Sequence, residues 1–251
     1  MSNQLRPLRW YKALAESKGR RQAGAFLVEG DRAIRQIIAS HPDSVSEILS
    51  VSEPPPAYRG YPVRILNESQ LKAVSSTRTP QGIMAIVNDP ADIYKDELPP
   101  DPGAKILLLE DIQDPGNAGT LIRTAAALDF AGVILSEKCA DPLAPKCVQA
   151  TAGAVLSVWL RRTPHYLDLA ARLRERGYTL AAAELNGDAA PEELARHQKL
   201  VLALGNEAAG LSAALLAGAD LRLRIPIVRE KAESLNVATC GAILMYLCSQ
   251  G

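Results

Sequence analysis

Short apolar runs in which polar residues do not alternate recur along the second half of the chain. Two clear examples are Lys105–Glu110 and Leu200–Leu204, whose inner positions are Ile, Leu, Val and Ala. A strand covered on both faces has this pattern, because neither set of its side chains meets water. Stretches with helical periodicity lie between the runs, as at 118–128. The alternation predicts an α/β fold with a mostly parallel sheet and helices on both of its faces.

The same patterns give approximate positions for the individual elements. A polar, proline-rich stretch from Asp89 to Gly103 separates the two halves and predicts a domain boundary. We expect a small α/β domain at 1–95, a linker at 96–104 and a larger domain at 105–251. In the small domain we expect strands at 26–28, 48–51, 63–66 and 82–87, and helices at 6–18, 31–38 and 68–74. In the larger domain we expect strands at 105–110, 133–135, 155–160, 180–183, 200–204 and 221–225, and helices at 118–128 and 234–248.

Composition limits the class of protein. Hydrophobic residues make up 47% of the 251 residues, which excludes a disordered chain. No apolar run approaches the roughly 20 residues of a membrane span, and the chain opens without an apolar leader. The four cysteines form no C-x-x-C pair and there are three histidines, so we expect reduced thiols and no metal site. These features favour a cytoplasmic protein.

Charge is unevenly distributed along a chain whose formal net charge is zero. Residues 1–35 contain eight basic and three acidic side chains, a net charge of +5, so the remainder carries −5. A basic N-terminal arm favours contacts with the phosphates of a nucleic acid. A solvated helix face would give the same pattern of charge. The candidate RNA contacts in this arm are Arg20, Arg21 and Arg32.

The first candidate loop is Asp114–Thr120, which follows the first strand of the larger domain. Pro115 and Gly116 turn the chain, and Asn117 could cap the next helix, whose first amides can bind an anion. Arg123 is a cation in a helix otherwise rich in Ala and Leu. A Gly-x-x-Gly pattern is a weak signal, and it lacks the lysine of a nucleotide P-loop and the third glycine of a dinucleotide fold. Taken alone, the loop is as compatible with a simple helix start as with a ligand site.

Two further loops follow later strands. Gly205–Ser212 begins with a glycine, which permits close approach of the backbone to a ligand. Glu207 in this loop should lie at the rim of the sheet, where it could either serve a ligand site or cap the following helix. The third loop runs from Ile225 towards the last helix, where Ser234 is a potential N-cap and Asn236 lies in the first turn.

Taken in order, these loops resemble the three signature motifs of the SpoU (TrmH-like) RNA 2′-O-methyltransferases of the SPOUT superfamily. The matching segments are Asp114–Ala125, Leu204–Glu207 and Ile225–Val237. The resemblance covers the second half of the chain throughout. In the first half, Phe26–Gly30 and Thr79–Ile83 resemble the SpoU substrate-binding domain, a ribosomal-protein-like RNA-binding module.

The resemblance implies features that periodicity cannot show. It implies a SPOUT fold that ends in a trefoil knot, an exception to the rule against threaded connections. It also implies S-adenosyl-L-methionine as the methyl donor, a structured RNA as the substrate and a homodimer that completes the active site across its interface. Ribosomal RNA is preferred to transfer RNA, because the N-terminal domain resembles that of relatives that modify ribosomal RNA. The alternatives are a transfer-RNA enzyme and a catalytically silent RNA-binding or ribosome-assembly factor.

The resemblance also implies roles for individual residues. Arg123 matches the catalytic arginine, and we expect it to bind the adjacent phosphate and stabilise the developing alkoxide, because a guanidinium is almost never deprotonated. Asn117 would hold Arg123 or the ribose, and Glu207 would orient Arg123 or the incoming nucleotide. Ser234 and Asn236 would line the methyl-donor site. The residues that match donor contacts are Leu204, Gly205, Ile225, Pro226, Leu235 and Asn236.

Three segments depart from the usual pattern of this family. Gln149–Ala154 stands where Arg-Ala-Ser-x-Gly-Ala is common, which would remove a basic RNA contact. Ala208 stands where glycine is frequent, and Val228–Ala232 is one residue longer than common and lacks a glycine, which would reshape the edge of the pocket. All five polar motif residues are retained, which favours an active enzyme. A nucleotide-dependent enzyme that uses the glycine loop at 116–119 is disfavoured, because the P-loop lysine is missing.

Overall fold

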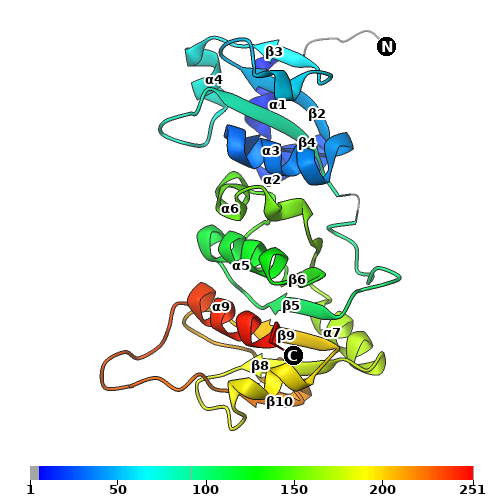
Figure 1. Cartoon of the computed structure of the whole chain (residues 1–251), viewed down its shortest axis with the longest axis vertical. Helices are drawn as coiled ribbons and strands as arrows, with labels where there is room; N and C mark the ends of the chain where they lie inside the picture. The colour runs from blue at the N-terminus through cyan, green and yellow to red at the C-terminus, as the bar shows by residue number, and fades with distance from the viewer. Residues whose placement is uncertain (1–5, 91, 251) are drawn as a thin grey trace. The chain divides into compact units, whose positions relative to one another are not determined.

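The computed structural model describes residues 6–90 and 92–250, which form two compact units (Figure 1). The first unit consists of Met1–Ala91 together with Asp141–Ser157. The second consists of Asp92–Ala140 and Val158–Gly251. The segment 141–157 therefore packs with the first half of the chain, although the sequence around it belongs to the second unit.

The first unit is built on a four-stranded sheet with the order β1-β4-β2-β3. The central strand β4 is antiparallel to β1 and β2, and the edge strand β3 is parallel to β2. Its elements are β1 (Ala25–Glu29), β2 (Val45–Ser50), β3 (Val63–Ile65), β4 (Ile83–Asn88), α1 (Leu8–Ala13), α2 (Ser17–Ala23), α3 (Asp31–Ser40), α4 (Glu68–Val74), α6 (Pro145–Thr151) and the 3-10 turns η1 (Pro42–Ser44), η2 (Pro56–Tyr58) and η3 (Ala154–Leu156).

Alternation along the strands divides the side chains of this sheet between two buried faces. Leu27 and Ile86 belong to a core cluster that includes Leu14 of the N-terminal region and Leu71 of α4. Helices α3 and α6 pack against β1. Every strand of this sheet lies close to its expected position. The single helix expected at 6–18 is wrong, because the chain is extended at Glu16 and continues as a separate helix, α2.

Arg20 of α2 is buried, with only 2% of its surface exposed. Its Nη1 donates to the carbonyl oxygens of Leu14 and Ala15, at 3.0 Å each, and its Nη2 is paired with the carboxylate of Asp141. The prediction that Arg20 contacts RNA is therefore wrong, because this guanidinium is enclosed and both of its terminal nitrogens are bonded within the protein. The side chains of Arg21 and Arg32 are exposed.

The second unit contains a six-stranded sheet in which all strands are parallel, with the order β10-β8-β9-β5-β6-β7. This confirms the predicted α/β fold class. Its elements are β5 (Lys105–Leu109), α5 (Pro115–Ala127), β6 (Gly132–Ser136), β7 (Trp159–Thr163), α7 (Tyr166–Glu175), β8 (Thr179–Ala183), the 3-10 segment η4 (Pro191–Arg196), β9 (Leu200–Leu204), α8 (Ala213–Gly218), β10 (Leu221–Leu223) and α9 (Val237–Cys248).

Both faces of this sheet are covered, as the unbroken apolar runs predicted. One core cluster joins the sheet residues Ile106 and Val201 to Leu169 of α7 and Leu215 of α8. On the other face, α9 packs against α5 and β9. A Cβ atom added to Gly241 would lie 2.3 Å from Leu121 Cδ2 and 2.7 Å from Leu204 Cδ1, so a larger residue would require both leucine side chains to move.

The strand expected at 155–160 is wrong. Residues 154–156 form the 3-10 turn η3, and the strand β7 begins at Trp159. A short apolar run does not by itself distinguish a buried turn from a buried strand, which explains the error.

The proline-rich stretch between the halves lies against the edge strand β7. The carbonyl of Ile93 accepts a hydrogen bond from the backbone N–H of Arg162 at 2.7 Å, and Glu97 O accepts one from Arg161 Nε at 2.6 Å. Trp159 Nε1 donates to Pro102 O at 3.0 Å. The bond from the Arg162 N–H satisfies a backbone donor of this edge strand, and the two side-chain bonds hold the stretch beside it. In the described parts of the chain, no helix is both long and apolar enough to cross a bilayer.

Candidate active site

The candidate site lies at the carboxyl ends of β5 and β9, neighbouring strands in the centre of the sheet. The chain moves outward from β5 through β6 to β7 and then returns to the other side of β5 with β8 and β9. Loops diverge at such a reversal of strand order, and ligands of open parallel sheets bind there. The first two candidate loops meet at this position.

The loop after β5 is shaped by the cap of α5. Asp114 Oδ1 accepts a hydrogen bond from the backbone N–H of Asn117 at 2.7 Å, and Pro115 occupies the first helical position. Asp114 is therefore the N-cap, and the expectation that Asn117 caps this helix is wrong. The amide side chain of Asn117 is consequently available for other contacts.

Asn117 joins the three candidate loops. Its Nδ2 donates to Glu207 Oε1 at 2.8 Å, and its Oδ1 accepts a hydrogen bond from Asn236 Nδ2 at 3.1 Å. The three residues lie in different parts of the sequence, separated by 90 and 119 positions from Asn117. The structure thus brings together three of the five predicted catalytic residues in one chain of hydrogen bonds.

The orientation of each amide in this chain follows from the backbone. Asn236 Oδ1 accepts from the backbone N–H groups of Ala238 at 2.9 Å and Thr239 at 3.2 Å, so Asn236 is the N-cap of α9. Its Nδ2 must then point to an acceptor, the oxygen of Asn117, which leaves the Asn117 nitrogen facing a carboxylate. Each hydrogen bond of the network therefore joins a donor to an acceptor. Ser234, expected as a potential cap, precedes the helix and does not cap it.

Two side chains for which the sequence motifs predict no role, Asn206 and Glu110, hold the loop after β9. Asn206 Nδ2 donates to Asp111 O at 2.9 Å, and its Oδ1 accepts from the N–H groups of Ala208 and Ala209 at 3.0 Å each. This closes a tight loop and ties it to the end of β5. A Cβ atom on Gly205 would lie 2.3 Å from the carbonyl carbon of Gly210, so this packing requires glycine.

Glu110, at the end of β5, is buried with 3% of its surface exposed. One carboxylate oxygen accepts from the hydroxyl of Tyr166, and the other accepts from the backbone N–H of Ser212 at 2.6 Å. Burial, followed by the hydrogen bond from its hydroxyl to Glu110, raises the pKa of Tyr166 well above its usual range. The buried carboxylate thus fixes the point where the β9 loop enters α8. Its signal in the sequence is a charged residue that ends an apolar strand.

A pocket of about 410 Å³ opens beside this network. Four of the six residues expected to contact the donor line it, namely Leu204, Gly205, Ile225 and Leu235. Ser234 and Glu207 also line it, whereas Pro226 and Asn236 are not among the lining residues. Its volume lies within the range of small-molecule sites, about 300–1,000 Å³. Among the described residues that line it, the charged side chains are Glu184 and Glu207, and none is a cation.

Arg123 is exposed on α5, and in the part of the chain that the structure describes it makes no hydrogen bond or ion pair. It lies six residues beyond Asn117, a rise of about 9 Å along the helix. The structure therefore does not join Arg123 to Asn117 or Glu207, and both of these side chains are bonded to each other instead. The guanidinium remains free for an external ligand.

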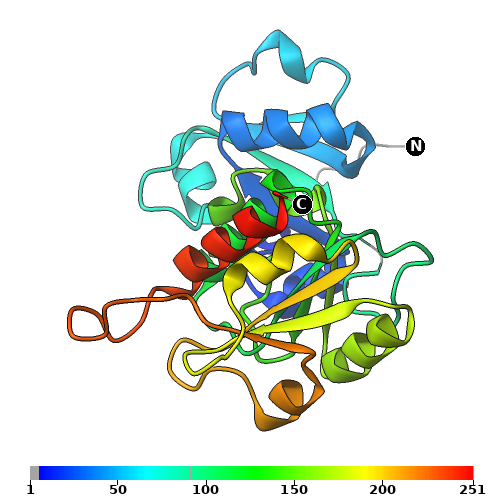
Figure 2. The same cartoon turned by 60° about the horizontal axis from the view of Figure 1, so that its bottom comes forward.

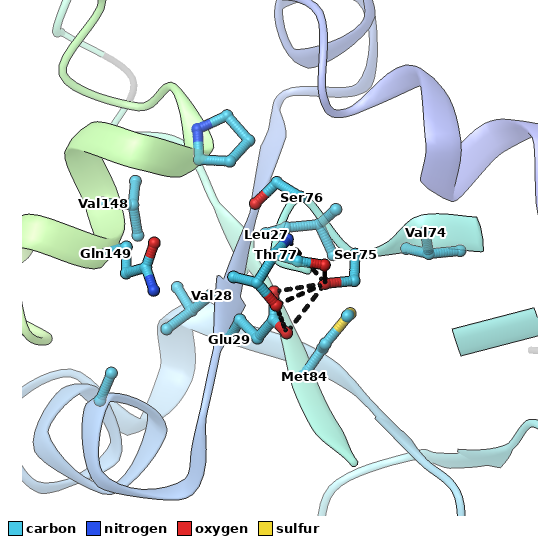
Figure 3. Close-up of a pocket in the computed structure, with 12 residues that line it drawn as sticks. Leu27, Val28, Glu29, Val74, Ser75, Ser76, Thr77, Met84, Val148 and Gln149 are labelled. Carbon is cyan, nitrogen blue, oxygen red and sulfur yellow. Dashed lines mark hydrogen bonds between the residues drawn. The ribbon is translucent and has the colours of Figure 1, made fainter. Parts of the chain in front are cut away.

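A second cavity lies in the first unit, between β1, the residues after α4 and the helix α6 (Figure 3). It measures about 20 Å³, room for about one water molecule rather than for a nucleotide. Glu29 dominates its polar side, accepting hydrogen bonds from Ser75 Oγ at 2.9 Å and Thr77 Oγ1 at 2.8 Å (Figure 3). Gln149 of α6 also lines it. Within residues 6–90 and 92–250, no group of three or more His, Cys, Asp or Glu side chains could hold a metal ion.

Comparison with known proteins matches both parts of the chain. The sequence profile of the SpoU rRNA Methylase family matches residues 104–246, and that of the MRM3-like substrate binding domain matches residues 8–85. The 23S rRNA (guanosine(2553)-2′-O)-methyltransferase RlmP of Bacillus subtilis is 35% identical over 241 residues, which cover 94% of this chain and 93% of that protein. A 23S rRNA (uridine(2479)-2′-O)-methyltransferase of Streptomyces viridochromogenes is 28% identical over 251 residues, with 94% of this chain and 86% of that protein covered.

Solved structures agree with these matches over the whole chain. The SpoU methyltransferase AviRb from Streptomyces viridochromogenes, in complex with AdoMet, has a TM-score of 0.85 at 27% identity and covers 97% of this chain and 96% of its own. An AdoMet-bound rRNA methyltransferase from Sinorhizobium meliloti has a TM-score of 0.81 at 27% identity, covering 100% of this chain and 95% of that one. The family resemblance seen in the three motifs is thereby confirmed, and the chain belongs to the SpoU rRNA methylase family.

Proposed function

We propose that this protein transfers the methyl group of S-adenosyl-L-methionine to a ribose 2′-hydroxyl of ribosomal RNA. The observation that carries the proposal is the chain of hydrogen bonds through Asn117, Glu207 and Asn236 beside a pocket of suitable size. The names of RlmP and of the Streptomyces enzyme, both 23S rRNA 2′-O-methyltransferases, support ribosomal RNA over transfer RNA. Such a substrate is met in the cytoplasm.

The pocket fits the methyl donor in size and in charge. Its walls carry apolar residues such as Leu204, Ile225 and Leu235, which suit an adenine ring. Its two carboxylates and its lack of lining cations, within the described residues, suit a ligand that bears a positive sulfonium. When bound, the donor supplies an activated methyl group. The residues that would hold the donor are Leu204, Gly205, Ile225, Ser234 and Leu235.

The chain's own residues contribute positioning and electrostatics. The Asn117–Glu207–Asn236 network fixes the rim of the pocket, and alignment of two reactants can supply about 7–11 kcal/mol of the barrier. Arg123 binds the phosphate beside the target ribose and stabilises the negative charge that develops on the 2′-oxygen as its proton leaves. This oxygen would then take up the methyl group that the donor supplies, and the electron pair of the former S–CH₃ bond would stay on the sulfur. A guanidinium is a poor base, so the hydroxyl proton leaves to solvent.

We propose that Arg123 acts at the pocket of a second copy of the chain in a homodimer. The separation of Arg123 from Asn117 along α5, together with its lack of a partner within the described chain, supports this arrangement. We also propose that the chain after β10 is threaded as a trefoil knot, as the family relationship implies. Arg21 and Arg32 of the first unit would contact the RNA backbone, because both are exposed and basic.

The test is incubation of the protein with labelled donor and unmodified total RNA, followed by mapping of alkali-resistant linkages. We expect one labelled position in ribosomal RNA and no labelling with Asn117→Ala. If only transfer RNA were labelled, transfer RNA would be the substrate instead of ribosomal RNA. Donor binding without label in either RNA would favour the silent RNA-binding factor, and absence of donor binding would overturn the proposal.

A further inference from the structure

Glu184 is a pocket carboxylate without a role in the reaction described above. It is the first residue after β8, and its backbone N–H donates to Leu223 O of β10 at 2.9 Å, which anchors it between two strands. Its side chain is partly buried and lines the pocket. Throughout residues 6–90 and 92–250, its carboxylate has no hydrogen-bond or ion-pair partner. A carboxylate in this position has its full capacity to accept hydrogen bonds from a ligand.

The neighbouring cation is already engaged elsewhere. Arg229 Nη2 donates to Leu185 O at 2.6 Å and to Asn186 Oδ1 at 3.1 Å. Arg229 lies in the longer than usual segment 228–232, part of the loop between β10 and α9 that extends away from the sheet of its unit (Figure 2). The bond to Leu185 O ties this loop to the residue that follows Glu184. The Arg229 guanidinium therefore binds the backbone at Leu185 and does not form an ion pair with the Glu184 carboxylate.

Sheet geometry places Glu184 away from the reacting end of the pocket. The strand β8 neighbours β9, which neighbours β5, and adjacent strands lie about 4.8 Å apart. The backbone at Glu184 is thus roughly 10 Å across the sheet from the end of β5, where Asn117 follows. Since the methyl group must lie near Asn117 and Glu207, Glu184 faces a part of the donor remote from the sulfonium.

Two remote parts of the donor could meet a carboxylate: the ribose hydroxyls and the amino-acid end. The amino-acid end carries its own carboxylate, and among the described lining residues no cation separates it from Glu184. The ribose offers two adjacent hydroxyl donors, which match the two oxygens of a carboxylate. In dinucleotide-binding α/β folds, an acidic side chain reads the ribose in this way.

We propose that the Glu184 carboxylate accepts hydrogen bonds from the two ribose hydroxyls of the methyl donor and so selects a ribonucleoside. This inference rests on the assignment of the pocket to the donor. Hydrogen bonds to a charged acceptor contribute enough that their loss weakens binding by about tenfold to a hundredfold. Glu184 would then determine which donors bind without taking part in the methyl transfer.

Calorimetric titration of the full chain tests the inference without measuring activity. The probes are S-adenosylhomocysteine, 5′-methylthioadenosine, which keeps the ribose but lacks the amino acid, and its 2′,3′-dideoxy analogue. For Glu184→Ala we expect affinity for the first two probes to fall about tenfold to a hundredfold, and affinity for the dideoxy probe to stay within about twofold. Glu184→Gln should show the same pattern with smaller losses. Asp188→Ala, which removes an exposed carboxylate outside the pocket lining, should leave all three affinities unchanged.

Three results would overturn the inference. An equal loss for all three probes would mean that Glu184 supports the pocket instead of reading the ribose. A loss for S-adenosylhomocysteine alone would assign Glu184 to the amino-acid end. If both Glu184 variants bound all three probes with unchanged affinity, Glu184 would have no part in donor recognition. If the unaltered protein bound none of the probes, the pocket assignment itself would fail, which is a separate outcome.

Discussion

Asp89 lies directly after β4, beside the buried Arg20–Asp141 pair, and it is ionised at a cost to stability. Burial raises the pKa of this carboxyl to about 6 from its ordinary 3.8, with Arg20 opposing the shift and Asp141 adding to it. One oxygen of Asp89 is enclosed and has no hydrogen-bond partner within the described chain. We predict that Asp89→Asn stabilises the protein at neutral pH, because a neutral amide replaces a carboxylate of nearly the same shape.

The size of the effect follows from the shift in pKa. A difference of about 2.2 units at about 1.36 kcal/mol per unit gives an upper limit of about 3 kcal/mol. Asp89 is only half-buried, so solvent screening reduces this to about 1–2 kcal/mol. For a protein of this size that gain corresponds to a rise in Tm of about 2–8 °C.

The sign of the pH dependence is fixed by proton binding. The folded state holds the Asp89 proton more tightly than the unfolded state. Well below pH 3.8 the carboxyl is protonated in both states and does not lower the free energy of unfolding, whereas above pH 6 it is ionised in both and lowers that free energy by the full amount. The gain from Asp89→Asn should therefore be largest at pH 8 and fall to about a third by pH 4.5. Thermal unfolding at both pH values measures it. A gain of equal size at both, or destabilisation at pH 8, would refute the reasoning.

Three further predictions follow. Arg20→Met should lower the free energy of unfolding by about 3–5 kcal/mol in chemical denaturation, because it leaves the largely buried Asp141 without its cationic partner, whereas Arg32→Met, at an exposed position, should change it by less than about 0.5 kcal/mol. Arg123→Lys should reduce turnover at least tenfold with donor affinity unchanged, since a lysine lacks the planar fork, and near-full activity would rule out the geometric role. Asn117→Leu should also reduce turnover at least tenfold while Tm falls by no more than about 8 °C, because two exposed hydrogen bonds contribute about 1 kcal/mol each; a larger fall in Tm would make the network a structural element.

Patterns that depend on local sequence could be predicted well. The strand β9 is buried along its whole length and coincides with the apolar run 200–204. The motifs also identified side chains that meet in space although they are far apart in sequence, because the loops that carry them end parallel strands. The family resemblance supplied the order of the loops, and the sheet topology supplies the reason why they converge.

Features that depend on tertiary contacts could not be predicted. Arg20 belongs to a basic run, and nothing local shows that its partner Asp141 lies 121 residues away. Ser234 and Asn236 are both good N-cap residues, and only the structure shows that Asn236 caps α9, with its Oδ1 accepting from the N–H groups of Ala238 and Thr239. Glu184 carries no motif, and its placement in the pocket became evident only from the order of β8, β9 and β10.

The assignment of 141–157 to the first unit has a consequence for synthesis on the ribosome. Domains generally fold in the order in which they emerge, from the N-terminus onward. Here the strands of the first unit are complete by Asn88, yet the partner of Arg20 and the helix that packs on β1 emerge only about fifty residues later. Until then, Arg20 of the nascent chain lacks its carboxylate partner and β1 lacks the helix α6. By the time Asp141 and α6 leave the exit tunnel, β5 and β6 of the second unit have already emerged.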